Sequence, residues 1–293
     1  MSEDGEARGA AERAEVIEDA AARAQSLGED ERWDEAYELL AEALEEQGDD
    51  PLLLTWAGMA AQRLGEESQA YDHFRAALAM EPSDPFVLAA AGSGLSALDD
   101  PAAEAALRMA ALTAPEFPFA RAAYGAYLAR EGLFGEAIAE LEAARGLAPE
   151  DAGVHAELGM AYLLAKRTDE GLDALEEALS RTPADSWLRG LFGLALVDAG
   201  RGEEGAEQLH QAAGERDDDV EVQLLAALAM GAQGWDDPAW AALARAEVHA
   251  DSSDRELITE VEDRLEAGPE AADEFLREDL GPTLLRERLL QRA

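Results

Sequence analysis

A spacing of 34 residues between equivalent positions constrains the fold of this chain more than any other feature of its sequence. Leu141 aligns with Leu175 at this step, and Pro149 aligns with Pro183. Further small and large apolar residues match at the same interval along much of the chain. Internal repetition at this period is typical of stacked helix–turn–helix units.

Two helices are predicted within each repeat. Residues 119–132 form the first helix of one repeat, with Gly132 as the helix-ending residue. Residues 134–149 form the second, closed by Pro149. A glycine inside a helix costs about 1 kcal/mol relative to alanine, so its recurrence at one place in the first helix indicates close approach of the partner helix. The recurring glycines are Gly58, Gly92, Gly125, Gly159 and Gly193.

These positions resemble the tetratricopeptide repeat family, whose pattern has glycine in the first helix and alanine, a large residue, alanine and proline in the second. Three repeats carry it most fully: Gly58, Ala70, Phe74, Ala77 and Pro82; Gly125, Ala137, Leu141, Ala144 and Pro149; Gly159, Leu175, Ala178 and Pro183. The third repeat is one residue short, and Ala24 and Ala227 replace the glycine in the first and seventh.

The resemblance implies an all-α fold, a right-handed superhelical solenoid of seven to eight helix–turn–helix repeats. We expect three regions along the chain. Residues 1–16 form an acidic N-terminal tail, residues 17–253 form an array of seven repeats, and residues 254–293 form a degenerate eighth repeat with a C-terminal capping helix.

The charge is strongly negative, with 65 acidic and 23 basic residues and a formal net charge of −42. Such a field repels nucleic acid and anionic membranes. The most apolar stretch, at residues 51–61, is too short to span a bilayer, and we expect a soluble, cytoplasmic protein. Two explanations of the acidity stay open: a halophile-like composition suited to a salty cytoplasm, or attraction of a basic partner.

No signature of catalysis is found. Cysteine is absent, and the four histidines are scattered without metal-ligand spacing. The segment Gly92–Ala97 matches a permissive dinucleotide pattern, but that pattern needs a preceding strand and Gly92 is already the repeat glycine. We therefore expect no enzyme activity, no cofactor and no metal.

In the family, the first helices line a concave surface in which partner peptides lie. Positions three before, one after and four after the repeat glycine share one helix face, and we predict that they form this groove. They are Thr55, Met59 and Gln62; Ala89, Ser93 and Ser96; Ala122, Ala126 and Ala129; Ala156, Met160 and Leu163; Gly190, Leu194 and Val197; Leu224, Leu228 and Gly231. The groove becomes apolar toward its C-terminal half.

At the predicted rim of the groove stand Phe86, Phe119 and Trp187, six residues before the glycine, with Arg63 and Arg130 as isolated positive charges. In the family, chaperone-binding members hold a terminal carboxylate in this groove with lysine and asparagine, an arrangement called a carboxylate clamp. This chain has no asparagine, and its single lysine, Lys166, lies past the groove. The sequence does not predict such a clamp.

The last twelve residues, 282–293, are basic and leucine-rich in an acidic chain. Leu284, Leu285, Arg288 and Leu289 are their candidate contact residues. Three interpretations stay open: a helix that caps the last repeat, a plug in the chain's own groove, or a link to a neighbouring chain.

Together these features predict a non-enzymatic scaffold or adaptor. It would bind a protein partner, through an apolar or amphipathic and Arg-flanked peptide or helix, in its concave groove. One alternative is a structural protein that self-assembles through groove and tail. Another is an acidic mimic that sequesters basic proteins.

Overall fold

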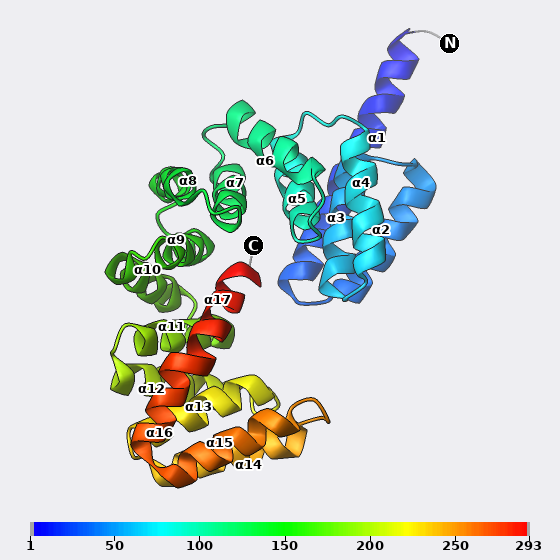
Figure 1. The fold of residues 1–293 in the computed structure, drawn as a ribbon. Helices are drawn as coiled ribbons and strands as arrows, with labels where there is room; N and C mark the ends of the chain where they lie inside the picture. The colour runs from blue at the N-terminus through cyan, green and yellow to red at the C-terminus, as the bar shows by residue number, and fades with distance from the viewer. Residues whose placement is uncertain (1–2, 292–293) are drawn as a thin grey trace. The chain divides into compact units, whose positions relative to one another are not determined.

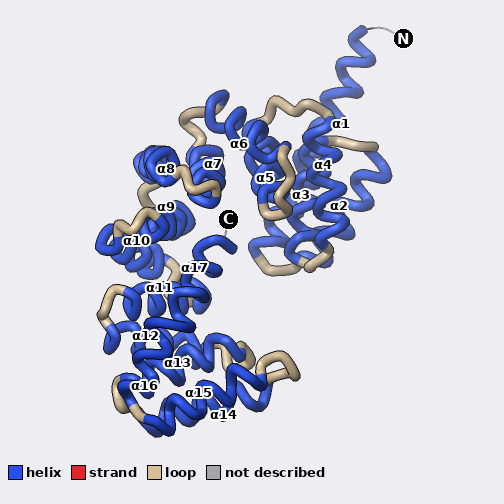
Figure 2. Tube along the Cα trace, viewed as in Figure 1, coloured by secondary structure: helices blue, strands red, loops and turns tan. Residues whose placement is uncertain are grey.

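A computed structural model describes residues 3–291, with side chains described from residue 11 to residue 290. Every regular element in this part of the chain is a helix (Figure 2). The chain divides into two compact units, one ending at Glu131 and the other beginning at Gly132. Residues 1–2 and 292–293, at the outer bounds of the predicted tail and capping region, lie outside the described residues.

Unit 1 consists of helices that pack mainly on their neighbours in sequence (Figure 1). The odd-numbered helices are the first helices of their repeats and contact one another in succession. The helices are α1 (Glu3–Glu29), α2 (Trp33–Gln47), α3 (Pro51–Arg63), α4 (Glu67–Ala79), α5 (Pro85–Ser96), α6 (Ala102–Thr113) and α7 (Pro118–Arg130).

Unit 2 continues the helix pairs and then departs from them. Its first seven helices are α8 (Phe134–Leu147), α9 (Ala152–Leu164), α10 (Thr168–Arg181), α11 (Ser186–Asp198), α12 (Gly202–Glu215), α13 (Val220–Ala232) and α14 (Asp236–His249). Four further elements follow: α15 (Arg255–Ala267), α16 (Pro269–Glu274), the π-helical segment η1 (Phe275–Leu280) and α17 (Gly281–Gln291).

Aspartates begin several first helices, among them Asp50 at α3 and Asp84 at α5. The Asp50 carboxylate accepts a hydrogen bond from the Leu52 N–H at 2.9 Å, and Asp84 accepts one from the Phe86 N–H at 2.7 Å. In both helices proline follows at the first helical position, where its missing N–H costs nothing. Local sequence thus sets where these helices begin.

The recurring glycines lie where the two helices of a repeat cross. A Cβ on Gly58 would lie 2.6 Å from the ring of Phe74, and one on Gly159 would lie 2.8 Å from Leu175. Real Cβ contacts are not this short. The expectation that glycine permits close approach of the partner helix is confirmed at these crossings.

Two boundaries differ from a regular array. Helix α1 runs through residue 16, so residues 3–16 extend the first helix rather than forming a separate tail segment. At the other end, α16 and α17 are joined without a break through η1. The region after residue 254 therefore contains one helix pair, α15 with α16, and a long helical continuation.

Candidate peptide-binding groove

The predicted groove positions of unit 1 lie at several depths. Thr55 and Ala89, three residues before the glycine, are fully buried, and the Thr55 hydroxyl donates to the Pro51 carbonyl at 2.7 Å. Met59 is half-buried and Gln62 is exposed. Ser93 and Ala122 are half-buried, whereas Ser96, Ala126 and Ala129 are buried. The position three before the glycine is thus part of the core at Thr55 and Ala89, because neighbouring helices cover it.

Aromatic rings form a ladder across three first helices of unit 1. The centroid of Phe86 lies 5.4 Å from that of Trp56 and 5.9 Å from that of Phe119, whose ring in turn lies 5.9 Å from Phe117. Phe119 is 39% exposed. The sequence indicated Phe86 and Phe119 as residues at the rim of the groove. It missed Trp56, which sits two residues before its repeat glycine instead of six.

The two rim arginines of unit 1 are engaged with neighbouring side chains. The guanidinium of Arg63 lies over the ring of Trp33, 5.5 Å from its centroid. Arg130 donates through Nη2 to the hydroxyl of Ser96. Each contact joins the arginine to a side chain of another helix, α2 for Arg63 and α5 for Arg130.

The C-terminal half of the predicted groove, which we call the unit 2 groove, is closed rather than open. Each of its side chains is less than a tenth exposed, although the sequence indicated a surface available to a partner. Part of the reason is that α15, α16, η1 and α17 pack against the first helices that carry these residues. In addition, Leu163 and Val197 pack at Gly171 of α10 and Gly205 of α12, the second helices of their own repeats. The unit 2 groove consists of Ala156, Met160, Leu163, Gly190, Leu194, Val197, Leu224, Leu228 and Gly231.

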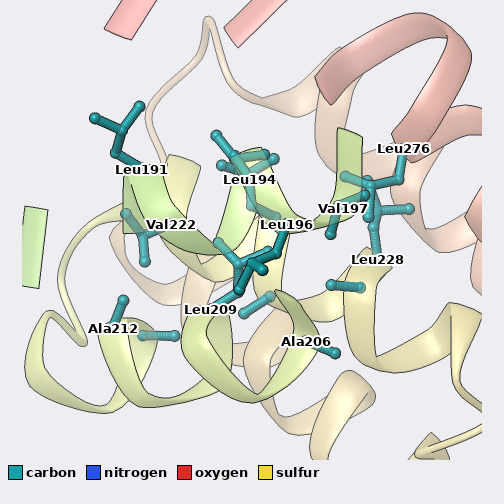
Figure 3. Close-up of a cluster of buried hydrophobic side chains, with 14 of the residues drawn as sticks. Leu191, Leu194, Leu196, Val197, Ala206, Leu209, Ala212, Val222, Leu228 and Leu276 are labelled. Carbon is teal, nitrogen blue, oxygen red and sulfur yellow. The ribbon is translucent and has the colours of Figure 1, made fainter. Parts of the chain in front are cut away.

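Part of the cover comes from α15 and η1. In Figure 3, Leu276 of η1 lies beside Val197 of α11 and Leu228 of α13. A Cβ on Gly231 would overlap a methyl carbon of Leu265, so α15 approaches α13 closely at this glycine. One end of the unit 2 groove is therefore filled by apolar side chains from later in the chain.

Helix α17 also covers the unit 2 groove, because it packs against α11 and α9 (Figure 1). Leu285 and Leu289, both 7% exposed, belong to the same buried core as the groove residues, and Leu284 packs half-buried against it. Trp187, predicted at the rim, also packs half-buried on this core. Helix α17 thus packs on the first helices of earlier repeats in its own chain, while α15 and α16 pack on the last regular repeat.

A charged contact accompanies the leucines. Arg288 of α17 donates from Nε and Nη2 to Oε1 of Glu221 in α13, at 2.9 and 2.5 Å. The Arg288 side chain is 7% exposed and that of Glu221 is 42% exposed. A Cβ on Gly190 of α11 would lie 3.1 Å from Arg288 Nη1. Glycine at position 190 therefore leaves space for the guanidinium.

Outside the groove, α9 carries a titratable group, Tyr162, whose pKa departs from its ordinary value. Burial raises the pKa of Tyr162 to about 12, and the hydrogen bond that its hydroxyl donates to Glu142 adds to the effect. His155 is also buried, with its Nε2–H directed at the Pro149 carbonyl, 2.8 Å away. No group of histidine, aspartate and glutamate side chains among the described residues is arranged to hold a metal ion.

Between residues 3 and 291, no helix is both long and apolar enough to cross a membrane.

The aspartates at 217–219 lie in the turn before α13. There Asp219 accepts from the Val222 N–H at 3.0 Å and forms an ion pair with Arg216 at 3.0 Å. This acidic turn begins a helix.

Residues 162–229 match the family model described as tetratricopeptide repeat. A thermophilic TPR protein of Thermus thermophilus is 26% identical, with a TM-score of 0.52 over 61% of this chain and 98% of that chain. PilW, a widely conserved type IV pilus biogenesis factor, is 23% identical, with a TM-score of 0.54 over 68% of this chain and 93% of that chain.

A chain of the APC/C hetero-tetramer Cut9–Hcn1 is 15% identical, with a TM-score of 0.67 over 83% of this chain and 48% of that chain. The likeness to PilW and to the Cut9–Hcn1 chain is one of fold. None of the curated proteins matches this chain.

Proposed function

Since this chain is a tetratricopeptide repeat protein with an all-α repeat fold, we propose that it is a non-enzymatic scaffold that binds a protein partner. The unit 2 groove is the binding surface, and its ligand is an amphipathic helix with leucines and arginine. Helix α17 occupies the groove when no partner is bound.

The observation that carries this proposal is the way α17 is seated. Leu285 and Leu289 are spaced i, i+4, so both lie on one face of the helix and both are buried in the core that contains Leu194 and Leu224. A helix lying in an apolar groove through such a stripe is a common mode of peptide recognition. Burying each leucine contributes about 1.5–3 kcal/mol relative to leaving it exposed.

Charge complementarity supports the same ligand. The chain carries a net charge of −42, whereas α17 brings Arg288 to the groove and carries Arg286 on its exposed side. A field of this sign accelerates association with basic segments, and buried apolar contacts supply most of the affinity.

A synthetic peptide with the sequence of residues 281–293 serves as the probe. The receptor is the full chain carrying Leu285→Asp and Leu289→Asp, here called the opened chain, whose own helix competes less well for the groove. We expect the opened chain to bind the labelled peptide by fluorescence anisotropy. The unsubstituted chain should bind it more weakly, because α17 is present at a high effective concentration.

A peptide with both leucines replaced by serine should not bind. Binding that persists without the leucines and collapses with added salt would support the acidic mimic instead. If no peptide binds an opened chain of unchanged helical content, the proposal of a peptide-binding groove is wrong.

A second candidate function, self-assembly, follows from the same helix. An α17 that enters the groove of another copy makes the same contacts and joins two chains. Light scattering on the full chain and on the opened chain tests this: an oligomer that becomes a folded monomer in the opened chain supports assembly, and a monomer in both excludes it.

A further inference from the structure

The two arginines of α17, Arg286 and Arg288, differ in how deeply their side chains are buried. Arg286 is exposed, whereas the Arg288 side chain is 7% exposed. Burial of a charge is unfavourable unless the protein supplies partners for it. The surroundings of Arg288 therefore show whether the groove is shaped for an arginine.

An anionic partner is supplied by α13. Glu221 lies in its first turn, and its Oε1 accepts from both Nε and Nη2 of Arg288. The planar guanidinium presents these two N–H groups in a fixed fork, which the ammonium of lysine cannot reproduce. The contact thus depends on arginine and not on positive charge alone.

Space for the guanidinium is supplied by α11. Three residues before the repeat glycine, this repeat has Gly190, where a Cβ would lie 3.1 Å from Arg288 Nη1. Arg288 Nη1 is buried and has no hydrogen-bond partner among the described residues. The other repeats carry a side chain at this position: Thr55, Ala89, Ala122, Ala156 and Leu224.

We propose that Gly190 and Glu221 form an arginine socket that determines which helices the groove accepts. The inference rests on the proposed function and adds the partner's signature. The occupant is a partner protein's helix with leucines at positions i and i+4 and an arginine at i+3. Leu285, Leu289 and Arg288 of α17 represent this signature within the chain.

The test compares labelled peptides of residues 281–293 on the opened chain. Peptides with Arg288→Leu and Arg288→Lys are matched by Arg286→Leu, which removes the same charge from an exposed position of the same helix. All three compete with the same weakened α17, so ratios of their affinities do not depend on that competitor. We expect the Arg288 peptides to bind at least tenfold more weakly and the Arg286 peptide to bind within twofold of the unsubstituted one.

A change in the receptor sharpens the test. On the opened chain carrying Glu221→Leu, the order should reverse: the Arg288→Leu peptide binds more tightly than the unsubstituted peptide. The reason is that an arginine buried there has lost its carboxylate, while two apolar side chains pack without that cost. Gly190→Leu should likewise remove the preference for arginine by filling the space of the guanidinium.

Equal binding of the Arg288 and Arg286 peptides would overturn the socket and leave the leucine-dependent groove intact. Failure of every peptide to bind would overturn the proposed function as well. A full chain that is a dimer, and becomes a monomer in the opened chain, would make a second copy the occupant and overturn the assignment to another protein.

The same preference can be measured within one chain, which covers the case of an opened chain that does not fold. Hydrogen exchange of the α17 amides reports how often that helix leaves the groove. Arg288→Leu in the otherwise unsubstituted chain should speed exchange across α17 at least tenfold, and Arg286→Leu should leave it within twofold. Similar rates in the two variants would contradict the socket.

Discussion

Gly159 and Gly171 face each other where α9 crosses α10. A Cβ on either residue would lie 3.1 Å from the carbonyl oxygen of the other, and 2.8 Å from a leucine side chain of the opposite helix. The next repeat has the same arrangement in Gly193 and Gly205. Two adjacent repeats of unit 2 are therefore held at a helix separation that only glycine allows.

Gly159→Ala should destabilise the protein by about 1–3 kcal/mol, because the added methyl group meets both Leu175 and a backbone carbonyl. Thermal unfolding monitored by circular dichroism measures the effect.

The matched control is Gly214→Ala in α12 of the same unit, where a Cβ would meet nothing within 4 Å. Alanine is the better helix former, so this change should stabilise by about 0.5–1 kcal/mol. A melting temperature that moves the same way in both variants would contradict the tight crossing at Gly159.

Tyr162 should make the protein sensitive to alkaline pH. Its pKa is raised from 10.0 to about 12 by burial and by the hydrogen bond to Glu142. Between these values the unfolded tyrosine loses its proton while the folded one keeps it, so stability falls as the pH rises from about 10 to about 12.

Urea unfolding of the wild-type chain and of Tyr162→Phe at pH 9 and pH 11 tests this. The free-energy advantage of the tyrosine over phenylalanine should shrink by about 1 kcal/mol between the two pH values. Unfolding curves of the two proteins that shift in parallel would show that Tyr162 titrates normally.

The ring stack of Trp56 on Phe86 should contribute beyond the burial of the two side chains. In a double-mutant cycle, Trp56→Leu and Phe86→Leu each keep an apolar side chain, so their coupling reports the ring contact. We expect about 0.5–1.5 kcal/mol, measured by urea unfolding of the four proteins.

A control cycle pairs Trp56→Leu with Leu112→Ser, at a side chain of α6 that is 71% exposed. These two changes should be additive. Equal coupling in both cycles would mean that the aromatic contact contributes nothing of its own.

Much of the fold could be predicted because its determinants are local. An aspartate such as Asp84 begins a helix through N–H groups two residues away, and a glycine such as Gly159 meets the very next helix. The 34-residue period repeats these local choices, so one repeat predicts the others. The groove positions share a helix face for the same reason, since the helical period alone relates Met160 to Leu163.

What covers that face depended on residues far away in sequence. Arg288 contacts Glu221, which is 67 positions away in the sequence. The missing side chain at Gly190 leaves space for the Arg288 guanidinium only because α17 packs there. The sequence determined that the chain stacks helix pairs. The tertiary structure decided that the unit 2 groove is occupied, because helical periodicity shows which residues share a face while only packing shows what lies on it.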